Sequence, residues 1–313
     1  MRKNIGFVLL AIGAALLAVG VVTVTWAPGV VKQTPLDVDT TTYLTGEASR
    51  LGADPQPIAI ESITQVDSET SADHEGTAVF VSTQCVMFAD SVDVDFCADP
   101  DDPDVLTIGT PDRFVTDRKT ALAVDEPGII DDEFRGPQQE GLVNKFPFDT
   151  QKKTYPLWDG ITERSWPAEY VGTETIDGLE TYHFSMTISD ESAKVVPPTD
   201  TVGTYSNQVD TWVDPVTGAF IRQTQDQQRV LEDGTVALDL QAAFTDDQVA
   251  ANVDEAESNI AKVDLVTKTM PIVGFAGGAL LLAAGGALVL LGRGKRRGDG
   301  AHARDDEREP VSV

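Results

Sequence analysis

Two uninterrupted apolar runs lie near the ends of the chain, and the sequence between them is polar with alternating apolar positions. The first run, Ile5 to Trp26, and the second, Ile272 to Leu291, contain no charged residue. At about 1.5 Å rise per residue, each is long enough to cross a hydrocarbon core of about 30 Å as a helix. The pattern predicts transmembrane helices over residues 5–26 and 272–291.

The first run has a second reading as a cleaved signal peptide. Arg2 and Lys3 would form its positive n-region. However, the run is longer than the usual apolar region of about 7 to 15 residues. A small-x-small cleavage site is also missing, because Trp26 and Pro28 flank the only candidate, Ala27. We therefore expect an uncleaved anchor.

Positive residues flank both runs and predict the topology. Arg2 and Lys3 precede the first run, and four basic residues follow the second: Arg293, Lys295, Arg296 and Arg297. Because Lys and Arg are enriched on the cytoplasmic side of membrane helices, residues 1–4 and 293–313 are expected to be cytoplasmic. Residues 27–270 then lie on the outer side of the plasma membrane. The charged tail, 293–313, is expected to be disordered.

Between the runs, period-two alternation predicts β-strands. It is clearest in two segments, whose apolar positions are Tyr182, Phe184, Met186, Ile188 and Val236, Leu238, Leu240, Phe244. Further strands are expected over residues 171–176, 209–214 and 219–231, separated by turns at Asp177-Gly178, 214–218 and Asp233-Gly234. Together they predict a curved antiparallel meander with one apolar face in a β-rich (α+β) domain over residues 27–245.

The first half of this domain is less regular. Residues 58–66 and 77–88 are β-prone and are expected to pair across the polar turn 67–76. Residues 99–104 read Asp-Pro-Asp-Asp-Pro-Asp and predict a loop, with loose calcium binding as an alternative use. Residues 134–166 are expected to form an irregular connection with short strands.

A helix is expected over residues 246–269. Thr245 can cap its N-terminus, and Asp246 and Asp247 suit its first turn. An apolar stripe then recurs at helical spacing: Val249, Val253, Ala256, Ile260, Val263 and Thr267. The stripe is expected to pack on the sheet or on the residues that leave the first apolar run. Pairing with a second chain is the alternative.

Charge narrows the range of partners. Of 23 Lys and Arg in the chain eight lie outside residues 27–270, and of 51 Asp and Glu five do, so this segment carries a net charge of −31. Such a surface repels nucleic acid and anionic head groups. Nucleic acid is therefore excluded as a partner, and a well-solvated surface is the simplest use of the acidity.

The two cysteines, Cys85 and Cys97, both lie in this segment. An oxidising compartment lets them pair, and a redox site would more naturally show Cys-x-x-Cys spacing. A structural disulfide is expected.

Motifs for catalysis and metal binding are missing from the sequence. It contains no Gly-x-Ser-x-Gly and no His-Glu-x-x-His, and its two cysteines cannot form a four-cysteine zinc site. The two histidines of the outer segment are His74, in a polar turn, and His183, on the polar side of a strand. We expect no catalytic residue, no metal and no cofactor, and hence a non-enzymatic protein. Glycines in both apolar runs can bring two membrane helices close together: Gly6, Gly13, Gly274, Gly277, Gly278, Gly285 and Gly286.

Four segments carry a family resemblance: KQTPLDVDTTTYLTGEA, DRKTALAVD, FPFDTQKKTYPLWDG and VDTWVDPVTGAF. From about residue 3 to residue 293 the chain resembles an uncharacterised family of actinobacterial envelope proteins often labelled porin PorA. The resemblance implies a Gram-positive, mycolate-bearing envelope, and its motifs imply no catalytic role. The strand rhythm of VGTETIDGLETYHFSMTIS also resembles bacterial periplasmic lipoprotein carriers, whose curved sheet surrounds an acyl-chain cavity.

These observations predict a membrane-anchored envelope protein that binds or transfers a lipid or a lipidated partner. Its ligand is expected on the apolar face of the sheet, at Tyr182, Phe184, Met186, Ile188, Val236, Leu238, Leu240 and Phe244. One alternative is a scaffold for envelope assembly that acts through protein partners. Another is a channel, as the family label implies, although one apolar sheet face is unlike the outward apolar band of a membrane barrel. The sequence leaves the oligomeric state open.

Overall fold

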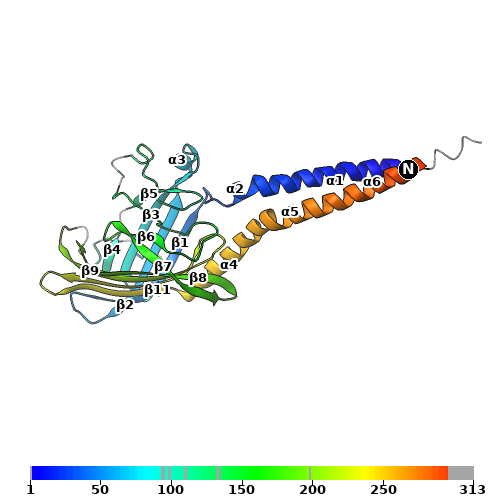
Figure 1. Ribbon diagram of the computed structural model, residues 1–313. Helices are drawn as coiled ribbons and strands as arrows, with labels where there is room; N and C mark the ends of the chain where they lie inside the picture. The colour runs from blue at the N-terminus through cyan, green and yellow to red at the C-terminus, as the bar shows by residue number, and fades with distance from the viewer. Residues whose placement is uncertain are drawn as a thin grey trace, which may run out of the picture. The chain divides into compact units, whose positions relative to one another are not determined.

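A computed structural model describes residues 2–92, 96–97, 99, 101–108, 111–131, 134, 136–196 and 199–294. The chain divides into two compact units, Met1–Val31 with Lys262–Val313, and Lys32–Ala261. The first unit is helical and the second contains the sheet (Figure 1).

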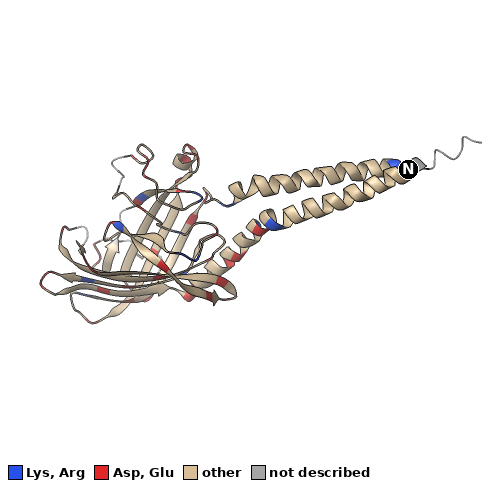
Figure 2. Cartoon of the chain, in the orientation of Figure 1, with Lys and Arg blue, Asp and Glu red and all other residues tan. Residues whose placement is uncertain are grey.

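The helical unit pairs the two ends of the chain. Its elements are α1 (Arg2–Thr25), α2 (Ala27–Val31), the π-helical turns η2 (Leu265–Thr269) and η3 (Val273–Gly277), α5 (Met270–Ile272) and α6 (Gly278–Gly294). Two helical stretches, Lys3–Thr25 and one ending at Leu291, are long and apolar enough to cross a membrane. The first stretch has one charged residue, Lys3, at its start. In the second, Asp246–Leu291, the charged residues lie between Asp246 and Lys268, and none follows before Leu291 (Figure 2).

Glycine determines how closely α1 and α6 approach. A Cβ atom on Gly13 would lie 2.9 Å from the carbonyl oxygen of Gly278, and one on Gly285 would lie 2.8 Å from that of Gly6. Near the other end of the pair, a Cβ on Gly274 would lie 2.7 Å from the Cα of Gly20. The two backbones are therefore in contact, and any side chain at these positions would separate them.

Pro271 explains the two π-helical turns. Proline lacks an N–H, and its ring collides with the carbonyl group four residues earlier in an α-helix. Here Pro271 lies in α5, and η2 and η3 flank it. Widened turns of this kind absorb such a defect. The sequence predicts separate helices over 246–269 and 272–291; instead, helical conformation continues through Met270 and Pro271.

The described part of the second unit forms one eleven-stranded antiparallel sheet. Its strands are β1 (Asp39–Arg50), β2 (Gln56–Val66), β3 (Thr77–Phe88), β4 (Val105–Ile108), β5 (Asp112–Asp117), β6 (Tyr155–Asp159), β7 (Arg164–Ile176), β8 (Leu179–Lys194), β9 (Val202–Val213), β10 (Phe220–Leu231) and β11 (Val236–Phe244). The spatial order is β4-β3-β2-β1-β11-β10-β9-β8-β7-β6, with β5 also paired to β3. The predicted meander from residue 171 to 245 is confirmed, as is the pairing of 58–66 with 77–88.

The sheet curves strongly, and β1–β3 run across the direction of β8–β11 (Figure 1). Isolated bridges connect its two ends through the irregular segment after β5. Thr116 pairs with Ala123, Leu122 with Leu142, and Leu142 with Leu157 of β6. This segment therefore covers the concave side, called the inner face below. A short helix, α3 (Ser68–Ala72), fills the predicted polar turn between β2 and β3.

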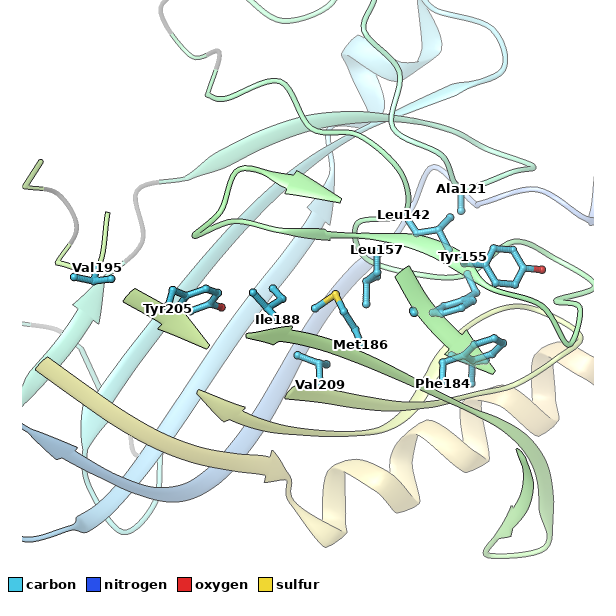
Figure 3. Packing of buried hydrophobic residues seen from close by; sticks show 13 residues of the cluster. Ala121, Leu142, Tyr155, Leu157, Phe184, Met186, Ile188, Val195, Tyr205 and Val209 are labelled. Atoms are coloured by element: carbon cyan, nitrogen blue, oxygen red, sulfur yellow. The ribbon is translucent and has the colours of Figure 1, made fainter. Parts of the chain in front are cut away.

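The inner face carries the main core. Phe146 of the covering segment packs on Tyr155 of β6 and Phe184 of β8, with ring centroids 5.2 and 4.5 Å apart. Figure 3 shows Tyr155 and Leu157 facing Phe184 and Met186 across this core. Alternation places charged side chains on the opposite face of the same strands; Glu47, Asp226 and Asp239 are examples. The face opposite the core, called the outer face below, therefore carries charge over these strands.

The predicted C-terminal helix is α4 (Asp246–Asp264). Thr245 caps it, because its Oγ1 accepts a 3.1 Å bond from the Gln248 N–H. The first three positions of the stripe, Val249, Val253 and Ala256, are buried against the sheet at Ile176, Leu179 and Ile221. This part of the stripe therefore packs within the chain and is unavailable to a second copy.

The predicted disulfide is present between Cys85 on β3 and Cys97. Closing a loop of this length stabilises a fold by about 3 kcal/mol in the chain-entropy model.

Two of the segments that carry the family resemblance lie against each other. The N–H groups of Phe146, Asp149 and Thr150 donate to the carbonyl oxygens of Gly218, Val216 and Pro215, at 2.8, 3.1 and 2.8 Å. The turn that accepts them is held by Asp214, whose carboxylate accepts from the Val216 and Thr217 N–H groups, both at 2.9 Å. Gly218 has φ +77° and abuts the Phe146 carbonyl group. These hydrogen bonds therefore hold the covering segment in place on the inner face.

Replacing Gly218 with alanine is expected to loosen this cover. Ala at positive φ costs about 1–2 kcal/mol, and overlap with Phe146 adds about 1–3 kcal/mol. Urea unfolding should therefore show a loss of at least about 2 kcal/mol for Gly218→Ala. Gly234→Ala is the control, since Gly234 has φ +86° and nothing within 4 Å of the added Cβ. Equal losses in the two variants would contradict the proposed contact.

Replacing Gly13 with leucine is expected to separate α1 from α6. The overpacked helix pair should lose about 1–3 kcal/mol. The measurement is helix unfolding by dodecyl sulfate titration of the full chain in mixed micelles. Gly286→Leu is the matched control, because nothing lies within 4 Å of a Cβ there. If Gly286→Leu is as damaging as Gly13→Leu, backbone contact is not what pairs the helices.

Candidate functional site

A cavity of about 160 Å³ opens on the inner face, between the covering segment and strands β8–β10. Register brings three of its lining residues side by side, since Met186 pairs with Val209 and Val209 pairs with Gln225. The residues that line the cavity are Val143, Leu157, Trp158, Asp159, Gly160, Met186, Asn207, Val209, Phe220, Gln223 and Gln225. Apolar and amide side chains thus share one wall.

Buried hydrogen bonds connect one end of this cavity to the core. The Tyr205 hydroxyl donates to Asp159 Oδ2 at 2.8 Å and accepts from Gln227 Nε2 at 3.3 Å. Arg229 Nε in turn donates to Gln227 Oε1 at 2.8 Å. Tyr205 is 0% exposed, so these bonds lie in a weakly screened environment.

The electrostatics of this group favour a fixed structure over proton transfer. Burial first, and then the Asp159 carboxylate, raise the pKa of Tyr205. Burial lowers the pKa of Arg229, while Tyr205 and Asp159 oppose that shift. Asp159 Oδ1 accepts from the Ile161 and Thr162 N–H groups at 3.1 and 2.8 Å. Both oxygens of this carboxylate are therefore engaged.

Asn207 is the exception among these groups. Its residue is 4% exposed, yet its Oδ1 atom has no hydrogen-bond partner. Its side chain lies near the Tyr205 hydroxyl and opposes the rise in the pKa of Tyr205. An unpaired buried acceptor costs about 1–3 kcal/mol, and such groups in native proteins call for an explanation. Because Asn207 lines the cavity, a donor bound there would satisfy it.

The eight predicted ligand-facing residues fall into two groups on the inner face. Phe184, Met186 and Ile188 are in the core under the covering segment, with Tyr182 packed beside them. Leu240 lies in a second cluster on β11, together with Leu238 and Phe244; Val236 begins that strand. Of the eight, Met186 lines the cavity. The ligand-facing role of these residues stays a prediction.

Sequence reasoning missed the polar residues of the site. Gln223, Gln225 and Gln227 recur with period two on β10, and Asn207 faces them across the pairing with β9. This alternation of amides in an otherwise apolar face was the available signal. It divides the inner face into two apolar clusters.

The structure describes three of the six residues predicted to set the topology. Arg2 and Lys3 begin α1, and Arg293 lies in the last turn of α6. Lys295, Arg296 and Arg297 lie outside the described residues.

His183 belongs to a separate cluster on the outer face of the sheet, opposite the core. Its Nε2 lies 2.8 Å from Asp210 Oδ1 and its Nδ1 lies 3.2 Å from Glu174 Oε1, while its ring stacks on Trp212 at 4.3 Å. Burial acts to raise the pKa of Asp210. Hydrogen bonds from His183, Gln208 and Ser185 together outweigh this effect, so the pKa of Asp210 lies below its ordinary value. Both ring nitrogens are occupied, and no group of three or more His, Cys, Asp or Glu side chains in the described part of the chain is arranged to hold a metal ion.

Lys145 lies in the covering segment beside the Asp214 turn. Its Nζ is 4.0 Å from the centroid of the Phe148 ring. Burial lowers the pKa of Lys145 to about 8, and Asp214 opposes this shift. The contact between the covering segment and the Asp214 turn therefore includes the Lys145 ammonium group, and Asp214 only partly offsets the cost of burying its charge.

Comparison with known proteins gives one family. The family model described as Porin PorA matches residues 5–287. A Porin PorA of Corynebacterium amycolatum is 28% identical over 227 residues, which cover 60% of this chain and 58% of the relative. A Porin PorA of Corynebacterium resistens is 31% identical over 106 residues, 30% of this chain and 26% of the relative. The chain thus aligns with less than two thirds of the length of these relatives.

Among solved structures, a LolA superfamily protein from Nitrosomonas europaea aligns with 69% of this chain and 89% of its own. At 9% identity and a TM-score of 0.15, this likeness is too low to bear on fold or function.

Stability is expected to rise with pH between about 8 and 10 because of Lys145. Its folded pKa of about 8 lies below the ordinary value of 10.5, so between these values the unfolded chain binds a proton that the folded chain does not. Urea unfolding at pH 8, 9 and 10 should show the rise, and Lys145→Met should abolish it. Lys153→Met, at an exposed position, is the control. An unchanged slope in Lys145→Met would contradict the assignment.

Proposed function

Because the chain belongs to the Porin PorA family, we propose that it is a non-enzymatic, membrane-anchored protein of the cell envelope. Its sheet binds a lipid or a lipidated partner, and the inner-face cavity is the observation that carries this proposal. The helical unit holds the protein in the plasma membrane.

The surface of α1 and α6 supports the anchoring. Large apolar side chains face outward along both helices; Phe7 is 53%, Val8 56% and Leu280 71% exposed. Contiguous apolar surface on this scale is unfavourable in water and suits a lipid environment.

Charge and cysteine chemistry support the proposed topology. Basic residues at both ends of the chain favour cytoplasmic termini. Residues 27–270 are then extracytoplasmic, where disulfides persist. The bond between Cys85 and Cys97 fits that compartment.

The size of the cavity limits what part of a lipid enters it. An engineered protein cavity of about 150 Å³ accepts one benzene molecule. The cavity of about 160 Å³ therefore takes a head group or a short end of a chain, and the rest of the lipid lies outside. Leu157, Met186 and Val209 supply its apolar contact.

The lining supports binding without catalysis. Asp159 is its only titratable group, and both oxygens of this carboxylate accept hydrogen bonds. The described residues around the cavity include no histidine, cysteine or serine.

Channel formation is the second candidate, and the names of the two Corynebacterium relatives favour it. The sheet itself is poorly suited to span a bilayer as a barrel, because Glu47, Asp226 and Asp239 lie on its outward face. Charge on the lipid side of a membrane barrel is strongly destabilising. A channel would therefore be built from the α1–α6 pairs of several copies.

Native mass spectrometry of the full chain tests the proposal. Protein purified gently from an actinobacterial host is expected to retain one lipid per chain. Gln225→Trp should fill the cavity and lose the adduct, whereas Gln228→Trp, exposed on the opposite face of the same strand, should keep it. A bare mass from well-folded wild-type protein would overturn lipid binding, and single-channel conductance in a planar bilayer would then favour the channel.

A further inference from the structure

The unpaired oxygen of Asn207 calls for a hydrogen-bond donor inside the cavity. The residue is 4% exposed, so this atom is shielded from bulk water. A ligand that reaches this atom must therefore carry an O–H or an N–H group.

Two further amide side chains in the cavity wall also call for a ligand with hydrogen-bonding groups. Gln223 and Gln225 line the cavity next to Val209, and Gln223 Nε2 makes only a long 3.4 Å bond to Thr211 Oγ1. Each amide offers an acceptor and donors together. Hydroxyl groups match this set, because each one also donates and accepts.

Charged ligands are poorly matched by the same wall. Both carboxylate oxygens of Asp159 already accept hydrogen bonds, one from the Tyr205 hydroxyl and the other from the Ile161 and Thr162 N–H groups. The nearby Arg229 is bonded to Gln227 and does not line the cavity. Among the described residues that line the cavity, a phosphate would find no cation and an ammonium group would find no free carboxylate. Burying either charge uncompensated is costly.

The remaining lining is flat and apolar. Phe220 and Trp158 contribute aromatic rings, and Met186 and Val209 contribute aliphatic surface. Such groups pack well against the C–H faces of a ring. The volume of about 160 Å³ fits a single ring.

We propose that the inner-face cavity recognises one uncharged, hydroxyl-bearing ring, of the kind found in a single sugar residue. The inference rests on the proposed function, and it names the head-group chemistry of the lipid. One hydroxyl donates to Asn207 Oδ1, others exchange hydrogen bonds with the Gln223 and Gln225 amides, and the ring faces pack on the aromatic wall. The same ring can reach the site as a free sugar or as the head group of a glycolipid.

Methyl NMR of methionine in the full chain, held in lipid nanodiscs, tests the proposal. The chain has four methionines, so their ¹³C-methyl signals can be assigned individually. Met186 lines the cavity, whereas Met87 on β3 and Met270 in the helical unit lie elsewhere. The probes are the methyl glycosides of glucose, galactose and mannose, with glycerophosphocholine as the charged comparison.

At least one glycoside is expected to shift the Met186 signal saturably and leave Met87 in place. Asn207→Leu should weaken this binding about tenfold or more, because the new side chain cannot accept a hydrogen bond. Gln208→Leu, exposed on the opposite face of the same strand, should bind as the wild type does. If Asn207→Leu does not fold, Gln223→Leu takes its place with the same expected loss.

The alternative results separate this inference from the proposed function. No shift from any glycoside, or a shift from glycerophosphocholine alone, overturns the ring proposal, while a lipid adduct in mass spectrometry still upholds lipid binding. If a glycoside shifts the Met186 signal but the protein retains no lipid, the ring proposal stands and the lipid-binding proposal is overturned. Octyl glucoside below its micelle concentration distinguishes the sources, since tighter binding than methyl glucoside indicates a glycolipid and equal binding indicates a free sugar.

Discussion

The pairing of β1 with β11 is the interaction on which the β unit depends. Each half of the sheet is a meander of neighbours in sequence. In the described part of the chain, this is the one continuous strand ladder between the halves, from Leu44 opposite Phe244 to Arg50 opposite Leu238. Gly46 allows it, because a Cβ there would overlap the Gln241 backbone. Without the junction there would be no curved inner face, and the covering segment would have nothing to span.

The sequence predicted the second meander well because its strands alternate cleanly and its turns carry Asp-Gly and Pro-Gly signals. It did not reveal β1, whose Thr-rich segment has few large apolar residues and is fixed by a partner some two hundred positions away. The polar site was hidden for a related reason. Whether Asn207 and Gln225 face solvent or a cavity depends on the covering segment, which has no periodicity of its own.

Two of the family motifs both hold the covering segment in place and contribute residues to the cavity. FPFDTQKKTYPLWDG supplies the cover and the last strand of the sheet, and VDTWVDPVTGAF supplies the turn that holds it. Backbone groups make most of the contacts between the two segments. Side chains of the same motifs, Trp158 and Phe220 among them, line the cavity. The groups that point to a ligand, Asn207 and the β10 amides, lie outside the first motif and beside the second.

The contact between α1 and α6 has a consequence for biosynthesis. Because the glycines that meet lie far apart in the sequence, α1 is synthesised long before its partner helix. During that interval β1 also lacks β11 and presents an unpaired strand edge, which is prone to association with other chains. Both connections therefore form only after β11 and α6 have been synthesised, and the earlier segments need protection from association until then.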